Sequence, residues 1–239
     1  MNGAPEQVVS RVREAIMSES RLRAQHRRVS LALRDGTLTL EGEVDTLASK
    51  KLTLERAAGV PDIDGIIDRL HVAPAQPMTD GEIGALMREA LLQEPAFSEF
   101  RLTGNDGETG DVDRAEAPGS ISFQVSDGVI TLNGSVPGLD YKRLAGVLAW
   151  WIPGSRDVIN GIAVEPPEED SFDSIAEAVR LVLEKDPFVD AAQLRVGVRG
   201  RVVTLAGVMP SEPQRHMAEM DAWYVFGVDN VVNNIEVRR

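Results

Sequence analysis

The chain has 239 residues, of which 43% are hydrophobic and 26% charged, a balance typical of a globular protein that can bury a core. Its 38 acidic residues against 25 basic ones leave a net charge of −13, which argues against nucleic acid as the main partner. Because the chain has no cysteine, disulfides, thiolate metal sites and cysteine nucleophiles are excluded.

The N-terminal stretch, residues 1–17, is polar and charged, and it lacks the apolar segment of a secretory signal. Nowhere does a run approach the roughly 18 apolar residues that a membrane-spanning helix needs. We therefore expect a soluble cytoplasmic protein, or a periplasmic one if a signal has been removed.

The motif Thr-Leu-x-Gly occurs three times, starting at Thr39, Thr131 and Thr204. When the three copies are aligned without gaps, similar residues recur through the next 33 positions. The clearest matching sets are Leu40, Leu132 and Leu205; Ala57, Ala149 and Ala222; Val60, Ile152 and Val225; and Val72, Val164 and Val237. A register of this length predicts three tandem copies of one structural unit.

Each copy begins with apolar residues at helical spacing, as in Val8, Val12 and Ile16. An alternating run then predicts a half-buried strand. Asp35-Gly36 and Asp127-Gly128 predict the tight turns that lead into the Thr-Leu-x-Gly strand.

In the third copy the sequence Arg199-Gly200-Arg201 stands at this turn, and we expect the turn to differ by one residue. Ser211 is predicted as the N-cap of the following helix. A last alternating strand closes each copy.

Each copy therefore reads α-β-β-α-β, an α+β fold in which a small three-stranded sheet is covered by two helices. We place the domains at residues 5–73, 79–165 and 171–239, and we expect them to pack on one another. Gly42, Gly134 and Gly207 end the motif in each copy, and we interpret them as structural glycines rather than ligand contacts.

BON (bacterial OsmY and nodulation) domains share a sequence pattern. It consists of a Thr-Leu-x-Gly strand preceded by glycine, a helix rich in alanine, and then the sequence Val-Pro-Gly-Val-x-x-Val-x-Asn-x-Leu-x-Val. The second part of this pattern stands at residues 60–72, 152–164 and 225–237, and the chain resembles the family over nearly its whole length. Two departures are Asp62, where the family usually has glycine, and Ser155, where an apolar residue is usual.

The resemblance implies a non-enzymatic bacterial protein without a cofactor. BON domains are associated with osmotic or envelope stress, phospholipid surfaces, secretin-type assemblies and, in one case, potassium. We accordingly expect a stress-related binding or scaffold protein that acts through a protein partner, self-association or a phospholipid surface. A potassium-binding sensor is the alternative hypothesis.

The helix predicted from Leu139 to Ile152 differs from its counterparts, because it is apolar on every side after Arg143. Trp150 and Trp151 lie near its end, and Trp223 and Tyr224 occupy the same columns in the third copy. We favour packing between the units for these aromatic residues over a surface for a partner or a membrane. All four are candidate binding residues.

Two charged segments are further candidates. The insertion at residues 101–120 is rich in acidic residues and glycine, and we favour a mobile acidic loop over a calcium site there because the spacing fits no calcium-loop motif. The first copy carries Arg21, Arg23, Arg27 and Arg28, which could contact phosphate or lipid headgroups. We favour a solvated loop, or pairing with the acidic units of this or another chain, for these arginines.

Charge is distributed unevenly along the chain. Residues 1–74 hold 11 basic and 11 acidic residues, whereas residues 75–165 carry a net charge of −8 and residues 166–239 a net charge of −5. The three histidines, His26, His71 and His216, lack metal-ligand spacing, and the sequence holds no nucleophile elbow, phosphate-binding loop or dinucleotide-binding motif. We therefore expect the protein not to be an enzyme.

Overall fold

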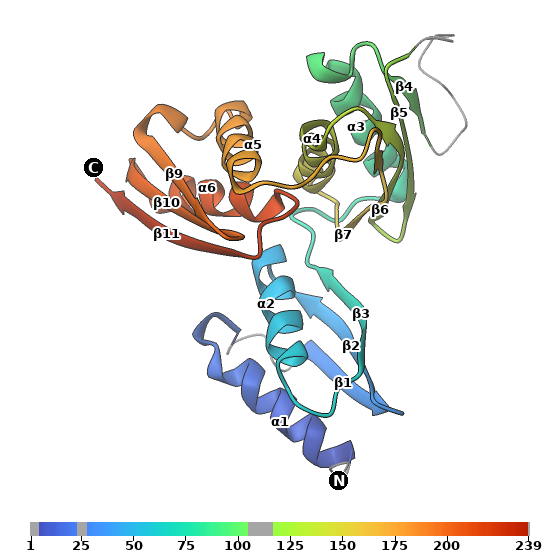
Figure 1. Ribbon diagram of the computed structural model, residues 1–239, viewed down its shortest axis with the longest axis vertical. Helices are drawn as coiled ribbons and strands as arrows, with labels where there is room; N and C mark the ends of the chain where they lie inside the picture. The colour runs from blue at the N-terminus through green and yellow to red at the C-terminus, as the bar shows by residue number, and fades with distance from the viewer. Residues whose placement is uncertain (1–4, 23–27, 105–116, 239) are drawn as a thin grey trace. The chain divides into compact units, whose positions relative to one another are not determined.

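The computed structural model describes residues 5–22, 28–104 and 117–238, and these form three α+β domains (Figure 1). The first domain is a compact unit by itself, Met1–Ala73, whereas the second and third domains together form the unit Pro74–Arg239. The predicted fold class is confirmed. The expected packing between repeats is therefore seen between the second and third domains.

The first domain follows the predicted element order. Its elements are α1 (Pro5–Ser18), the 3-10 turn η1 (Ser20–Leu22), β1 (Val29–Arg34), β2 (Thr37–Val44), α2 (Leu47–Ala58) and β3 (Gly65–Val72). The strands lie in the order β1-β2-β3, with β1 antiparallel and β3 parallel to the central β2. Both helices contribute apolar residues to the core over one face of the sheet.

The second domain repeats this order with a larger sheet. Its elements are α3 (Asp80–Gln93), η3 (Pro95–Phe97), β4 (Arg101–Thr103), β5 (Ser120–Ser126), β6 (Val129–Val136), α4 (Leu139–Trp151), β7 (Asp157–Asn160) and β8 (Ala163–Val164). The added strand β4 pairs with β5, and the last strand is divided at Gly161 into β7 and β8, which both pair with β6. The sheet therefore exceeds the three strands that we expected.

The predicted acidic insertion at residues 101–120 contains structure at both ends. Its first three residues form β4, and Ser120 begins β5. Residues 105–116, which hold all of its acidic side chains, lie outside the described residues, and so does the calcium alternative placed on them.

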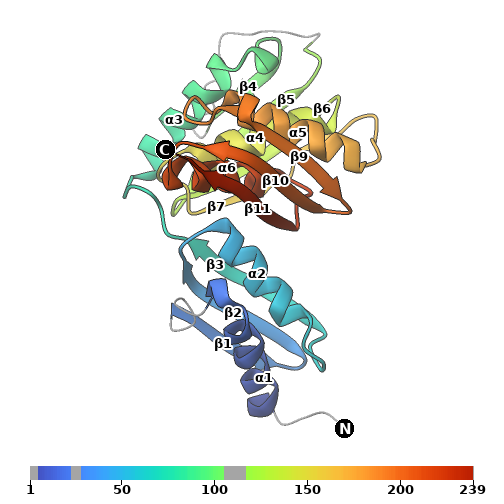
Figure 2. The same cartoon turned by 90° about the vertical axis from the view of Figure 1, so that its left-hand side faces the viewer.

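The third domain returns to the three-stranded form. Its elements are α5 (Phe172–Lys185), η4 (Ala191–Gln193), β9 (Leu194–Arg199), β10 (Val202–Met209), α6 (Glu212–Tyr224) and β11 (Asn230–Val237). Figure 2 shows α5 and α6 behind this sheet, whose other face is open. Ser211 caps α6 as predicted, because its side chain accepts a hydrogen bond from the backbone N–H of Gln214.

The three hairpin turns have the same length, so the expectation that the third differs by one residue is wrong. Asp35-Gly36 and Asp127-Gly128 have positive φ at both positions, the geometry of a type I′ turn. In the third domain Arg199 pairs with Val202, which leaves Gly200 and Arg201 as the two turn residues. Of these two turn residues, only Gly200 has positive φ. The glycine therefore occupies the first turn position in the third domain and the second in the other two, so the turn type changes and the turn length does not.

The glycine that ends each Thr-Leu-x-Gly motif is required by the sheet itself. Gly42, Gly134 and Gly207 have φ values of 143°, 128° and 149°. A Cβ atom on any of them would stand 2.0 Å from a backbone carbonyl oxygen of the approaching segment. Close backbone approach therefore explains the repeated glycine, in agreement with the structural interpretation.

A side-chain amide joins the last strand to the second helix in two of the domains. Asn160 accepts a hydrogen bond from the N–H of Ile162 and donates one to the carbonyl of Lys142 in α4. Asn233 does the same in the third domain, where its amide donates to the carbonyl of Arg215 in α6. The asparagine of the repeated pattern therefore fixes strand to helix.

Candidate functional site: the joint between the second and third domains

Helix α4 lies between the sheet of its own domain and helices α5 and α6 of the third domain (Figure 1). Its side chains are buried continuously from Arg143 to Ala149, which agrees with the prediction of a helix that is apolar on all sides. The second half of α4 therefore forms the centre of a joint between two domains, and packing between units is the role that the structure shows.

Arg143 is the main polar residue of this joint. Its side chain is only 2% exposed, and its guanidinium pairs with the carboxylate of Asp170 in the linker before α5. It also donates hydrogen bonds to the Ser174 hydroxyl at 3.3 Å and to the carbonyl of Phe226 at 3.0 Å. One buried cation thus connects α4 with the linker, with α5 and with the loop after α6, and each contact satisfies a donor that would be costly to bury alone.

Three of the four aromatic residues predicted from the sequence make contacts at the same joint. Trp150 stacks on Tyr224 with ring centroids 5.7 Å apart and planes at 7° to each other. Trp151 donates a hydrogen bond from its indole nitrogen to Asp221 of α6 at 2.9 Å. Trp223 is fully buried, which places it in the interior of the unit. Whether any of the four contacts a partner stays a prediction.

Asp221 is an acid in an apolar site. Its side chain is 3% exposed, and this burial raises its pKa to about 8. The hydrogen bond from Trp151 acts in the opposite direction, and the neighbouring carboxylate of Asp186 raises the pKa again. Burial and then the charge of Asp221 also raise the pKa of Tyr224 to about 12. The joint therefore contains a carboxyl group that changes charge near neutral pH.

A fourth contact lies at the far end of α5. Lys185 places its ammonium 2.9 Å from both carboxylate oxygens of Glu94, which follows α3 in the second domain. Together with Arg143, Trp151 and the stacked pair of rings, it makes the two domains one body.

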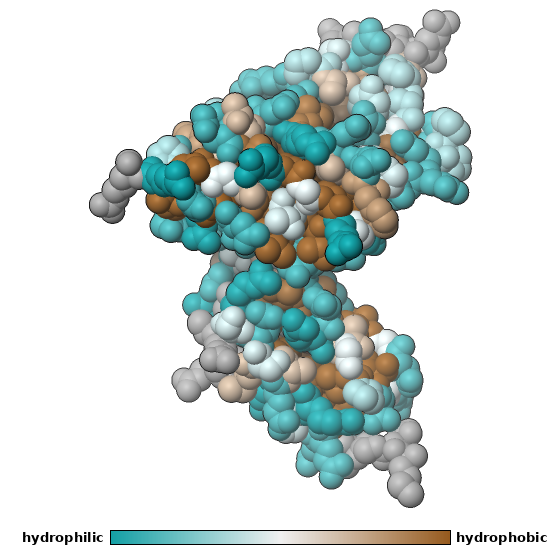
Figure 3. All heavy atoms as spheres, turned by 60° about the vertical axis from the view of Figure 1, so that its left-hand side comes forward, coloured by the Kyte–Doolittle hydropathy of each residue, from teal (hydrophilic) through white to brown (hydrophobic). Residues whose placement is uncertain are grey.

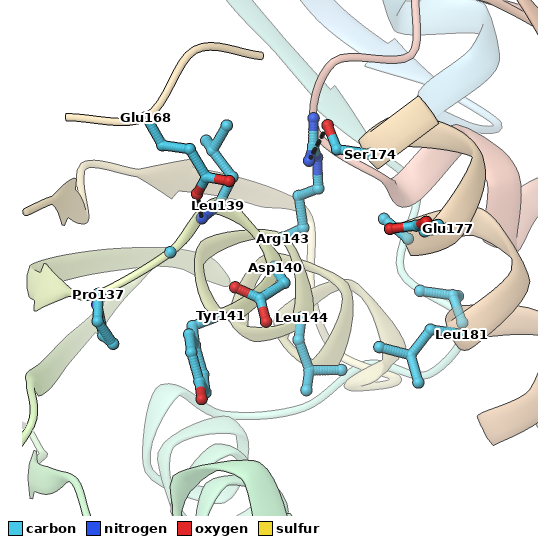
Figure 4. Close-up of a pocket in the computed structure, with 13 residues that line it drawn as sticks. Pro137, Leu139, Asp140, Tyr141, Arg143, Leu144, Glu168, Ser174, Glu177 and Leu181 are labelled. Atoms are coloured by element: carbon cyan, nitrogen blue, oxygen red, sulfur yellow. Dashed lines mark hydrogen bonds between the residues drawn. The ribbon is translucent and has the colours of Figure 1, made fainter. Parts of the chain in front are cut away.

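A groove of about 550 Å³ opens beside this joint, between the first half of α4 and α5 (Figure 4). Its walls are apolar: Leu144 and Leu181 point toward one another across it, and Ala178 and Val182 continue the α5 side. Leu181 is 37% exposed, so an apolar wall is open to solvent. A shape of this kind, apolar inside and polar at the edge, is typical of binding sites.

The edge of the groove is acidic. Asp140, Glu168 and Glu177 line it, and its one basic lining residue is Arg143, whose charge is paired with Asp170. Glu168 has a structural task, since it accepts the N–H of Leu139 at 2.8 Å and so caps α4, whose N-cap residue Gly138 has no side chain. Within the described part of the chain, no basic side chain pairs with Asp140 or Glu177.

The arginine cluster of the first domain is placed only in part. Arg21 lies 3.6 Å from Glu19, and Arg28 lies 2.8 Å from Asp45, so both described arginines face acids of their own domain. Arg23 and Arg27 lie outside the described residues. Contact of this cluster with lipid or phosphate stays a prediction.

Metal and membrane sites were also predicted as alternatives. In residues 5–22, 28–104 and 117–238, no three side chains of His, Asp or Glu are grouped so as to hold a metal ion. The potassium hypothesis, which rests on backbone carbonyls, stays a prediction. Every helix in the described parts of the chain is too short or too polar to cross a bilayer.

Apolar side chains also reach the surface away from the groove. Figure 3 turns the third-domain sheet toward the viewer and shows apolar residues interspersed with polar ones. Val232 on β11 is exposed, as are its counterparts Ile67 and Ile159 in the other domains. Single exposed aliphatic residues of this kind are ordinary on a folded surface.

Sequence reasoning identified the aromatic residues but missed their polar partners. Asp170, Ser174 and Asp221 carry no motif, and they lie 27, 31 and 70 residues from the α4 side chains that they contact. The available signal was Arg143 itself, the last charge before the apolar half of the helix, because a charge beside a buried helix surface needs a partner.

The fold and the joint define this chain as a protein of repeated α-β-β-α-β domains, two of which are fused into one body. A profile of the BON domain matches residues 6–74, 111–166 and 171–239. The chain therefore belongs to the BON domain family and carries three copies in tandem, as the sequence pattern predicted.

Two solved structures show a likeness to the chain. Both are of CdsD, a structural protein of the type III secretion system of Chlamydia trachomatis, one of them its C-terminal domain. Each is 14% identical to this chain, and each alignment covers 97% of this chain. The alignments cover 98% of the first structure and 92% of the second, with TM-scores of 0.26 and 0.25. At these TM-scores the likeness carries no argument about function. No curated protein sequence matches the chain.

Proposed function

We propose that this protein is a non-enzymatic binding or scaffold protein, and that its fused second and third domains hold a protein partner in the groove between α4 and α5. The observation that carries the proposal is an open apolar groove on a joint that is fixed on several sides. Because Arg143, Trp151 and Lys185 hold the two walls in place, little conformational entropy is lost when the groove is filled.

The aromatic residues fit this proposal as positioning residues. Trp150 and Tyr224 contact each other, and Trp151 contacts Asp221, so these side chains serve the joint that supports the groove. A protein partner is favoured over a phospholipid surface, because the carboxylates of Asp140, Glu168 and Glu177 repel anionic headgroups.

The test is affinity purification from the native cell with the wild-type chain and with Leu181→Ser. We expect the variant to lose the partner that the wild type retains, because an apolar wall becomes polar. Leu92→Ser is the matched control, since Leu92 lies on α3, outside the groove, and is 55% exposed. The control should retain the partner.

Two results would contradict the proposal. One is a partner that Leu181→Ser retains as fully as the wild type does. The other is co-sedimentation with anionic liposomes that is unchanged by Leu181→Ser, which would favour a lipid surface elsewhere on the chain.

A further inference from the structure

The edge of the groove has unpaired negative charge on both of its sides. Asp140 stands in the first turn of α4, and Glu177 stands on α5, with its carboxylate turned toward the groove in Figure 4. Both are exposed, and no described Lys or Arg is paired with either.

The one cation in the lining leaves this imbalance intact. Arg143 is 2% exposed and directs its guanidinium to Asp170, Ser174 and the carbonyl of Phe226, away from the solvent of the groove. A ligand in the groove therefore meets apolar walls and carboxylates, with no available positive charge among the lining residues.

We infer that the groove accepts a cationic peptide segment of the partner, which inserts an apolar side chain between Leu144 and Leu181 and places Lys or Arg against Asp140 and Glu177. This inference rests on the proposed function and specifies the chemistry of its partner. The apolar insertion supplies most of the binding energy, whereas the charge complementarity selects among partners and speeds association.

Groove size and charge together favour a peptide over other cations. The volume of about 550 Å³ holds a few side chains and exceeds what a single metal ion needs. Acid groups on opposite walls also match cationic side chains on either side of an apolar anchor. An extended polypeptide provides this arrangement with Lys or Arg two residues before and two residues after the anchor, because residues i−2, i and i+2 point to the same face.

The test uses fluorescence polarisation with the full chain and a short labelled peptide of sequence Lys-Ser-Leu-Ser-Lys, whose leucine and lysines lie on the same face of an extended chain. A second peptide replaces each lysine with glutamate. We expect only the cationic peptide to bind, and we expect Asp140→Asn combined with Glu177→Gln to weaken it about tenfold, since two exposed charge pairs are lost. Leu181→Ser should weaken it by a similar factor because the anchor loses its contact.

The matched control is Glu89→Gln combined with Asp190→Asn, which removes two exposed carboxylates outside the groove and leaves the same net charge as the groove variant. This control should bind the cationic peptide as the wild type does. Equal weakening by the control would show attraction to the net charge of the chain and would overturn the inference.

Three other outcomes separate the inference from the proposed function. If the groove charge variant binds normally while Leu181→Ser still loses its partner, the cationic specificity is wrong and the proposed function stands. If Leu181→Ser retains both the peptide and the partner, both fall. Self-association that Leu181→Ser abolishes, without any binding of peptide, would assign the groove to a second copy of the chain and overturn the inference.

Discussion

The second helix of the first domain and that of the second domain occupy the same place in one repeated unit, yet they face different surroundings. The outer positions of α2 carry Glu55, Arg56 and Ala58, which are exposed or half-buried. The matching positions of α4 carry Val147, Leu148 and Trp150, of which the first two are buried. A few residues at equivalent positions of the second helix thus distinguish a domain that is compact by itself from one that is fused to a neighbour.

A buried polar contact also differs between these domains. In the first, Asp68 replaces the asparagine of the other two and lies 3.1 Å from the ammonium of Lys50, which is buried and donates to the carbonyl of Leu70. In the second, the amide of Asn160 performs the connection to the helix. An ion pair and a neutral amide therefore solve the same problem of joining strand to helix.

The fused unit can be followed separately in solution. The three tryptophans of the chain, Trp150, Trp151 and Trp223, all lie in the second and third domains. Tryptophan fluorescence therefore reports the unfolding of this unit, whereas circular dichroism reports both units.

The largest expected effect is that of Arg143→Met. This change removes the donor to the carbonyl of Phe226 and the main partner of the Asp170 carboxylate, which keeps weaker contacts with Ser174 and Arg201. Removal of one partner of a buried pair costs at most about 3–5 kcal/mol. Urea unfolding followed by tryptophan fluorescence should show this loss. Arg11→Met is the control, because its pair with Asp62 is largely exposed and is expected to contribute about 0–1 kcal/mol. Similar losses in the two variants would contradict the central role of Arg143.

Trp150→Ala comes next, and it gives α4 the residue that α2 has at this column. Loss of the stacked contact with Tyr224 and of the apolar area around it should cost about 2 kcal/mol, less than for a fully buried tryptophan. The linker at residues 165–170 should then be cut faster in limited proteolysis, since the joint opens more often. Cleavage at the wild-type rate would show that the stack does not hold the domains together.

Asp221→Asn tests the pH dependence of the joint. The pKa of Asp221 is about 8 in the folded state against an ordinary value of 3.8, so the folded chain holds a proton that the unfolded chain releases. The free energy of unfolding should therefore fall as pH rises from about 4 to about 8, with a slope of at most about 1.4 kcal/mol per pH unit, and then level off.

Asn at position 221 keeps an oxygen for the Trp151 N–H but cannot ionise. The variant should lose the contribution of this residue to the slope, as urea midpoints measured across this pH range will show. An unchanged slope would assign the titration to another group.

The smallest effects concern the strand-to-helix connection. Asn160→Asp removes the amide donor to the carbonyl of Lys142 and should cost about 1–2 kcal/mol, because that acceptor becomes unsatisfied. Asp68→Asn in the first domain keeps an acceptor for Leu70 but weakens the pairing with Lys50. Circular dichroism should register the second change and tryptophan fluorescence only the first. A fluorescence change on Asp68→Asn would contradict independent unfolding of the two units.

The sequence by itself determined the repeated unit, because its signals are local. Alternation in β1, β5 and β9 follows from strands with one buried face, and the glycine of each Thr-Leu-x-Gly motif follows from a backbone approach that excludes a Cβ. The turn of the third domain shows a limit of such signals, since the position of Gly200 changed the turn type where a change of length was expected.

Only the tertiary structure decided which surfaces meet. The apolar half of α4 predicted an interface, but its partners, Asp170, Asp221 and Phe226, lie 27 to 83 residues away from the α4 side chains that they contact. The acidic groove likewise combines residues of α4, α5 and the linker between them. Such contacts leave no periodic pattern in the chain, because they depend on how finished helices pack and on which buried charges find partners there.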